Sequence, residues 1–157
     1  DKQIIDYIRY NIRSQIFAKS LPMPLVVGNL KRLELLRTQP QLKEKLWENA
    51  LKLQKGLKER GFDIGKTDSV VTPIYMKGDV PEATAMVMDI RENYHIFCSI
   101  VVYPVIPKGH IIYRLIPTAV HTDEDIQKTL EAFSATKKKL DAGEYKVEAI
   151  PDMADSK

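Results

Sequence analysis

The most regular hydrophobic pattern of the chain runs through residues 41–60. Apolar residues recur there at steps of three and four, which is the spacing of one helix face. They are Leu42, Leu46, Ala50, Leu53 and Leu57. Pro40 precedes this segment and Gly61 follows it, as is typical of helix boundaries. A helix with one apolar stripe must bury that stripe against another layer, so the chain has to supply helices or strands that pack on it.

The segments before and after this helix differ in their predicted secondary structure. Residues 2–12 and the stretch from Pro24 to Pro40 are predicted to be helical, and prolines in the irregular piece 14–24 block a continuous helix between them. Beyond Gly61 the sequence predicts strands at 70–76, 96–103 and 110–116. A helix opened by Asp79 separates the first two strands, and Thr122 caps a last helix. Pro73 favours an edge position or a bulge for the first strand.

These elements predict an α/β fold of the α+β-like kind: N-terminal helices followed by a small sheet of about three strands covered by helices. We expect residues 1–140 to form one small domain together with its connecting helices. Residues 141–157 show no periodicity, so we expect a flexible tail there.

Composition excludes several classes of protein. The net charge is +3, and its basic excess lies in the first 60 residues, on faces of the predicted helices. No tight Lys/Arg cluster with interleaved aromatics is present, so we expect no nucleic-acid binding. No apolar run is long enough for a transmembrane segment. The single cysteine rules out an internal disulfide. The chain begins with Asp1 and carries no leader-like segment, which suggests a fragment or a processed product.

Catalytic motifs are missing from the sequence. The three histidines His95, His110 and His121 are not at metal-ligand spacing, and neither a nucleophile elbow nor a phosphate-binding glycine loop occurs. Cys98 lies in an apolar strand, which favours a core position over a nucleophile. Taken residue by residue, the chain contains no complete catalytic constellation.

Arg114 is the one residue that breaks its local pattern. It interrupts the apolar strand His110-Ile-Ile-Tyr-Arg-Leu-Ile116, where alternation places it on the face of Ile112 and Ile116. An arginine among isoleucines needs an anion to compensate it. A structural ion pair or a position at the sheet edge would explain Arg114, and so would a fork that holds a ligand anion.

Short segments in two parts of the chain, residues 6–22 and 103–126, carry a resemblance to a known family. Three segments resemble the C-terminal part of the α-oxoamine synthases: Tyr103-Pro-Val-Ile-Pro-Lys-Gly109, the strand with Arg114, and Thr118-Ala-Val-His-Thr-Asp-Glu-Asp-Ile126. Asp6-Tyr-Ile-Arg-Tyr-Asn11 and Ile16-Phe-Ala-Lys-Ser-Leu-Pro22 are similar to the stretch after the cofactor lysine of that family. The resemblance spans roughly residues 1–140.

The resemblance implies the C-terminal domain of a fold-type I enzyme that depends on pyridoxal phosphate. Such enzymes are acyltransferases that condense an amino acid with an acyl-CoA and release CO2. The implied enzyme is a cytoplasmic homodimer. The lysine that binds the cofactor lies upstream of the matching segment in the family, and no equivalent occurs in this chain. We therefore expect no catalytic residue in this chain, no bound cofactor and no activity of the chain alone.

Three residues take roles from the resemblance. Arg114 matches the family arginine that binds the carboxylate of the amino-acid substrate. Ser20 lies where the family approaches the cofactor phosphate of the neighbouring subunit, although a helix cap ahead of Pro22 would equally explain a serine there. Lys19 could add charge to the same phosphate or to CoA, or be an ordinary solvated lysine. His121 belongs to the matching motif, and a structural role is favoured for it.

Departures from the family pattern bear on the substrate. Ile112 stands where some members carry a second arginine, and Ile116-Pro117 replaces a more polar pair. This apolar strand favours a long-chain acyl donor, as in serine palmitoyltransferase, with serine or glycine as the amino acid. Glycine C-acetyltransferase (2-amino-3-ketobutyrate CoA ligase) and 8-amino-7-oxononanoate synthase are alternatives within the family. A non-catalytic anion-binding or dimerisation module is an alternative from another class.

Overall fold

The computed structural model describes residues 1–146, and contacts between Cα atoms divide the chain into two units that meet at residues 40 and 41. The first unit is helical, with α1 (Lys2–Asn11), α2 (Arg13–Ile16) and α3 (Met23–Thr38). None of these helices has a buried residue. The sequence predicted one domain over residues 1–140, whereas the contacts group residues 1–40 apart from the rest.

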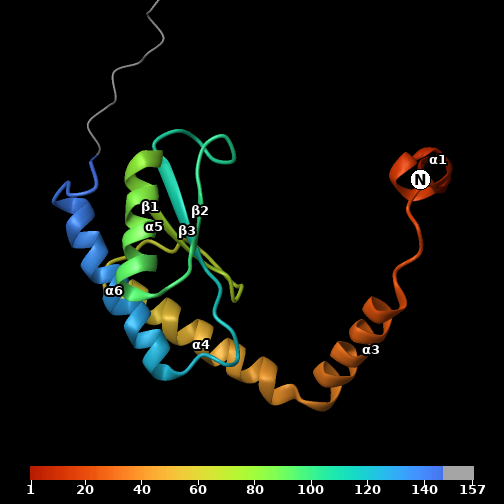
Figure 1. Cartoon of the computed structure of the whole chain (residues 1–157), viewed down its shortest axis with the longest axis horizontal. Helices are drawn as coiled ribbons and strands as arrows, with labels where there is room; N and C mark the ends of the chain where they lie inside the picture. The colour runs from red at the N-terminus through yellow and green to blue at the C-terminus, as the bar shows by residue number, and fades with distance from the viewer. Residues whose placement is uncertain (147–157) are drawn as a thin grey trace, which may run out of the picture. The chain divides into compact units, whose positions relative to one another are not determined.

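The second unit contains the sheet and the long helix (Figure 1). Its elements are α4 (Pro40–Glu59), β1 (Thr72–Lys77), α5 (Val80–Tyr94), β2 (Ser99–Val101), β3 (His110–Leu115) and α6 (Asp123–Asp141). The three strands are antiparallel in the order β1-β3-β2, so β3 is central and β1 is an edge strand, as Pro73 predicted. The predicted α+β architecture is confirmed.

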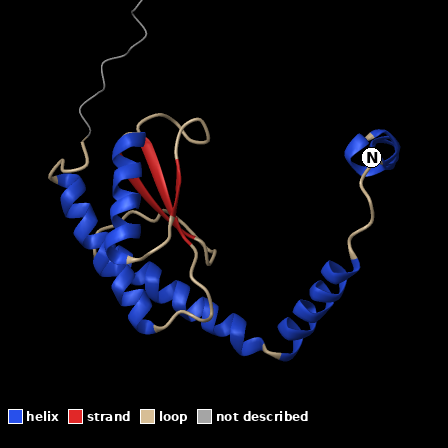
Figure 2. Ribbon diagram, viewed as in Figure 1, coloured by secondary structure: helices blue, strands red, loops and turns tan. Residues whose placement is uncertain are grey.

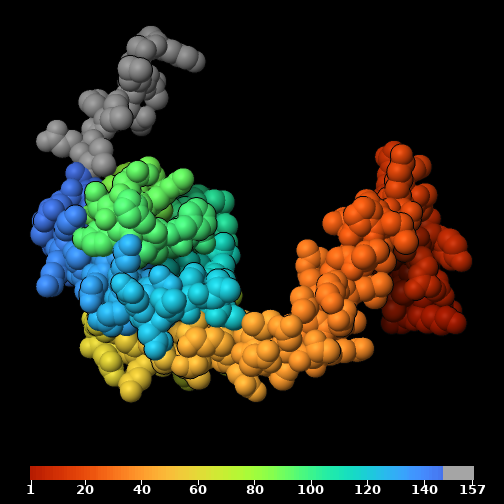
Figure 3. All heavy atoms as spheres, turned by 60° about the horizontal axis from the view of Figure 1, so that its bottom comes forward, coloured from red at the N-terminus to blue at the C-terminus, as the bar shows by residue number. Residues whose placement is uncertain are grey.

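Alternation along the strands separates a buried from an open face of the sheet. On β3, Ile111, Tyr113 and Leu115 are buried, while His110 and Arg114 are exposed. Helices α5 and α6 lie side by side and pack on the buried face (Figures 2 and 3). Within the second unit, no described helix covers the open face.

The core lies between the sheet and its helices. The ring of Phe133 on α6 meets the rings of Tyr113 and Phe62 edge to face, at centroid distances of 6.0 and 6.2 Å. Helix α4 approaches α6 closely at Gly56, where an added Cβ would lie 2.4 Å from Leu130 Cδ1. The apolar stripe predicted for 41–60 therefore supplies Ala50, Leu53 and Leu57 to the core.

The predicted helix caps form as the sequence indicates. Asp79 accepts a hydrogen bond from the backbone N–H of Glu82, whose side chain bonds back, and Thr122 and Asp125 make the same reciprocal arrangement at α6. Strand β2 is shorter than the predicted 96–103. The N–H of Ile96 donates to Ile90 O at the end of α5, so the first residues of that segment close the helix instead of pairing.

The flexible tail predicted from residue 141 starts too early. Tyr145 is buried and its hydroxyl donates to Asp89 on α5, which ties residues 141–146 to the core. Absence of periodicity hid this contact, because a single buried side chain after a helix leaves no repeating pattern. The rest of the predicted tail, 147–157, lies outside the described residues.

Candidate functional site

Arg114 lies on the open face of the sheet, in the central strand β3. The register places it directly between Pro73 on β1 and Ser99 on β2. Residues directly opposite in a sheet share a face, so these three side chains are neighbours. Ile112 on β3 lies on the same face as Arg114, as alternation predicted, and Ile116 follows directly after the strand and is exposed.

The Arg114 guanidinium has one described partner. Its Nε donates to Ser99 Oγ at 3.1 Å. Among residues 1–146, no acidic side chain lies within ion-pair distance of it. The structural ion pair considered from the sequence is therefore absent from the described part of the chain. The two terminal nitrogens of Arg114 make no hydrogen bond or ion pair within residues 1–146, and two free guanidinium nitrogens suit a bidentate carboxylate.

Lys19 and Ser20 lie in the first unit, in the segment between α2 and α3. Both are exposed, and neither side chain makes a hydrogen bond or ion pair with another residue in the range 1–146. Ser20 does not cap α3, because the residue before that helix is Pro22 and no side-chain cap bond forms there. An exposed ammonium and a hydroxyl are suitable donors to a phosphate.

The loop after β3 is held by α4 and by its own histidine. The buried Asn49 donates through Nδ2 to the carbonyl oxygens of Thr118 and His121, at 2.9 and 2.8 Å. The ring Nδ1 of His121 accepts the N–H of Thr118 at 3.1 Å, which fits the structural role favoured from the sequence. Asn49 could not be predicted from the sequence, because an asparagine within an amphipathic helix resembles an ordinary surface residue.

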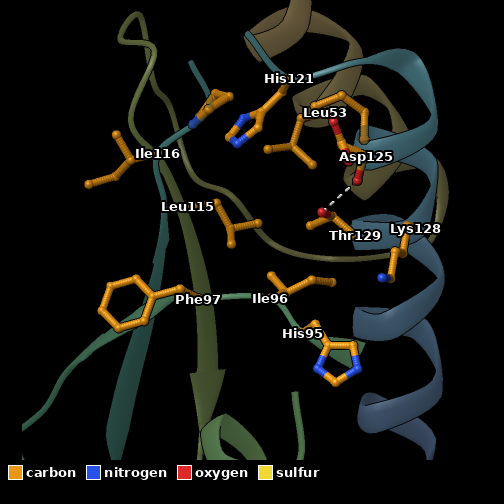
Figure 4. A pocket seen from close by; sticks show the side chains of 12 residues that line it. Leu53, His95, Ile96, Phe97, Leu115, Ile116, His121, Asp125, Lys128 and Thr129 are labelled. Carbon is orange, nitrogen blue, oxygen red and sulfur yellow. Dashed lines mark hydrogen bonds between the residues drawn. The ribbon is translucent and has the colours of Figure 1, made fainter. Parts of the chain in front are cut away.

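A cavity of about 230 Å³ lies beside this loop, between the ends of α5 and β3 and the first turns of α6 (Figure 4). Its lining mixes apolar side chains such as Leu53 with polar ones such as Lys128. The polar side chains of Asp125 and Thr129 on α6 form hydrogen bonds with residues at the start of the same helix. Asp125 caps the helix through Thr122, whose N–H and hydroxyl hold the pKa of the Asp125 carboxyl below its ordinary value. Thr129 donates to the carbonyl of Asp125. Arg114 is not among the residues that line this cavity.

Neither thiol nor metal chemistry is supported within the described residues. Cys98 is buried in the core, and burial raises the pKa of its thiol to about 11, which opposes a reactive thiolate. No group of His, Cys, Asp and Glu side chains in residues 1–146 could hold a metal ion. No helix of this range is long and apolar enough to span a bilayer. Among the described lysines, none is buried.

Comparison with known proteins identifies relatives along nearly the whole chain. A cysteate-C-fatty acyltransferase of Capnocytophaga ochracea is 58% identical over 98% of this chain, which corresponds to 37% of the relative. A serine palmitoyltransferase of Sphingobacterium spiritivorum is 33% identical over 83% of the chain and 32% of the relative. The 2-amino-3-ketobutyrate coenzyme A ligase of Escherichia coli is 30% identical over 88% of the chain and 34% of the relative. No family model matches the chain.

Comparison with solved structures also identifies serine palmitoyltransferases. A serine palmitoyltransferase from S. paucimobilis with bound PLP and myriocin matches 87% of this chain and 34% of its own, with a TM-score of 0.74 and 27% identity. The chain spans about a third of the length of the curated relatives that it matches. These matches cover the chain as the C-terminal part of α-oxoamine synthase family members, which confirms the resemblance stated from its motifs.

Proposed function

We propose that this chain is the C-terminal part of an α-oxoamine synthase that joins an amino acid to a fatty acyl-CoA. In this reaction the thioester C–S bond breaks, a C–C bond forms at the amino-acid Cα, and the Cα–carboxylate bond breaks. CoA and CO2 leave. The single observation that carries the proposal is the Arg114 guanidinium, exposed on the open sheet face without an acidic partner in residues 1–146.

The chain's own contribution to this reaction is to bind and orient the substrate. The terminal nitrogens of Arg114 hold the substrate carboxylate, which fixes the bonds around Cα relative to the cofactor. The apolar neighbours Ile112 and Ile116 limit water around this ion pair and strengthen it. Pyridoxal phosphate, when bound, supplies an electron sink for the charge that develops at Cα.

Lys19 and Ser20 fit the cofactor phosphate by their chemistry. Both are exposed donors, and Ser20 is not engaged as a helix cap. In the intact protein, Ser20→Ala is expected to weaken binding of pyridoxal phosphate about 10- to 100-fold, the effect of one lost hydrogen bond to a charged group. Ser14→Ala in α2 is the matched control and is expected to leave cofactor affinity unchanged. Equal affinities of Ser20→Ala and the control would remove Ser20 from the site.

Cysteate is the amino acid that we place first, and serine second. The cysteate-C-fatty acyltransferase shares 58% of aligned residues with this chain, against 33% for the serine palmitoyltransferase. The relatives that use glycine or the substrate of 8-amino-7-oxononanoate synthase are at 30–34% identity, the same range as the serine palmitoyltransferase, so identity does not rank these three. Serine is placed ahead of the other two because the apolar strand around Arg114 is consistent with a long-chain acyl donor.

Product analysis tests this function directly. The intact protein is loaded with pyridoxal phosphate and incubated with palmitoyl-CoA plus L-cysteate, L-serine or glycine, and mass spectrometry follows the α-amino ketone that condensation at Cα would form. We expect the cysteate product to form fastest, with one CoA released per CO2. Absence of any condensed product, with the cofactor bound, would overturn the assignment. Binding of amino acids without cofactor uptake would instead support a non-catalytic anion-binding module.

We further propose that the enzyme is a cytoplasmic homodimer and that this chain alone is inactive. Exposed apolar side chains on α1, such as Ile4, Ile5 and Tyr7, support association, because that helix buries nothing within the first unit. The inactivity is supported by the lysines, none of which is buried among the described residues as a cofactor-binding lysine requires. Sedimentation of the intact protein tests the homodimer, cell fractionation tests the cytoplasmic location, and an activity assay of the chain alone tests its inactivity.

A further inference from the structure

Of the two residues directly opposite Arg114 in the described sheet, only Ser99 can accept a hydrogen bond through its side chain. On the other side of β3, the residue opposite Arg114 is Pro73, which has neither a hydroxyl nor an N–H group. Along the open face, Ile112 on β3 and Val101 on β2 are apolar, and so is Ile116 just after β3. The diagonal neighbour on β1 is Tyr75, whose hydroxyl makes no hydrogen bond to Arg114 within residues 1–146. The bond from Arg114 Nε to Ser99 Oγ, at 3.1 Å, is therefore the one polar restraint that the described residues place on the guanidinium.

This bond decides which edge of the guanidinium is available. A carboxylate can bind an arginine side-on, through Nε and one terminal nitrogen, or end-on, through the two terminal nitrogens. Ser99 occupies Nε, so the end-on edge remains. A planar group held at Nε also loses its freedom to rotate about the side-chain axis, which lowers the entropy cost of binding the carboxylate.

We propose that Ser99 is a positioning residue, which holds Arg114 so that its two terminal nitrogens receive the substrate carboxylate end-on. This inference rests on the proposed function, in which Arg114 binds that carboxylate. Ser99 itself does not touch the substrate. It fixes the orientation of the residue that does, and it does so from an edge strand, where a hydroxyl can be added or removed without opening the core.

Variants of Ser99 separate the hydroxyl from its other properties. Ser99→Thr retains the hydroxyl, and Ser99→Val is close to threonine in shape and lacks it. Both residues are β-branched and suit a strand, so this pair keeps the comparison meaningful even where Ser99→Ala folds poorly. All variants are made in the intact protein loaded with pyridoxal phosphate, and binding is followed through the visible absorption of the cofactor.

The ligands are an amino acid and its counterpart without the carboxylate: L-cysteate with taurine, and L-serine with ethanolamine. We expect Ser99→Val and Ser99→Ala to weaken amino-acid binding about 5- to 20-fold, because Arg114 still binds the carboxylate but is no longer held in the end-on orientation. Ser99→Thr is expected within about 3-fold of the parent protein. Affinity for taurine and ethanolamine should not change in any of these variants, because neither ligand has a carboxylate for Arg114 to bind. A general structural defect would instead weaken binding of both ligands of a pair.

A double variant tests whether Ser99 acts through Arg114, and the single variants separate this role from the proposed function of Arg114. If Ser99 acts through Arg114, then Ser99→Val adds no further loss in an Arg114→Ala background. A strong effect of Arg114→Ala with equal affinities for Ser99→Val and Ser99→Thr would overturn the role of Ser99 and leave the proposed function standing. Unchanged amino-acid binding in Arg114→Ala would overturn the proposed function itself. Equal losses for an amino acid and its decarboxylated counterpart would also contradict positioning by Ser99.

Discussion

Asn49 on α4 holds the carbonyl oxygens of Thr118 and His121 with a single amide nitrogen, at 2.9 and 2.8 Å. The two carbonyls belong to the loop that follows the Arg114 strand, some 70 residues farther along the chain. This contact joins the long helix to the segment that leaves the site. Its amide is fully buried, so no water can replace it.

Removal of the Asn49 amide should therefore destabilise the fold. Asn49→Ala leaves two loop carbonyls without their donor, and we expect a loss of about 2–4 kcal/mol in the free energy of unfolding of the chain. Urea denaturation measures it. Gln127→Ala on α6, whose amide bonds only to an exposed Glu131, is the control and should cost less than about 0.5 kcal/mol. Comparable losses for the two variants would show that the loop is not held by Asn49.

Acid should weaken the contact between α5 and the segment after α6. Burial by itself raises the pKa of Asp89, but hydrogen bonds from Lys139, Tyr145 and Asn93 outweigh it and hold the pKa of this carboxyl below its ordinary value. A carboxyl with a lowered folded pKa stabilises the fold above its unfolded pKa, about 3.9, and loses that contribution as pH falls through the folded pKa.

The variant Asp89→Asn tests this pH dependence. The parent chain should lose stability below about pH 4, and Asp89→Asn should show a smaller loss over the same range because it no longer titrates. Urea denaturation at pH 7, 5, 4 and 3 gives the comparison. Asp68→Asn, at an exposed position in the loop before β1, is the control and should follow the parent chain. Parallel curves for the parent and Asp89→Asn would refute the role of Asp89.

Cys98 should be unreactive while the chain is folded. Burial raises the pKa of its thiol to about 11, and the side chain is 5% exposed, so little accessible thiolate is present near neutral pH. We expect an aromatic disulfide reagent at pH 8 to titrate Cys98 at least about 100-fold more slowly in buffer than in denaturant. Equal rates in the two conditions would place Cys98 outside the core.

Periodic features of this chain could be predicted from its sequence, and pairing could not. Residues 41–60 repeat their apolar residues often enough to fix a helix and its buried stripe, and alternation around Arg114 was sufficient to place this residue on a face with Ile112 and Ile116. The partner of Arg114 was not predictable, because nothing local to Ser99 sets its register against β3. That register depends on how β2 packs over residues distant in sequence.

The same limit explains the other differences. Tyr145 is a single residue after the last helix, so its burial leaves no pattern, and the segment was predicted to be flexible. The first residues of 96–103 have strand-forming side chains, yet Ile96 is used to end α5. Motif resemblance supplied the family and the roles proposed for Arg114, Ser20 and Lys19, none of which follows from periodicity.

Amino-acid binding by the intact protein tests the central claim most directly. The protein loaded with pyridoxal phosphate is titrated with L-cysteate and L-serine, and the visible absorption of the cofactor reports binding. Arg114→Ala should weaken binding at least about 30-fold, because a bidentate charged contact is lost, while cofactor affinity stays within about 2-fold. Arg91→Ala, at an exposed position in the last turn of α5, should bind as the parent protein does. Unchanged amino-acid affinity in Arg114→Ala would contradict the account.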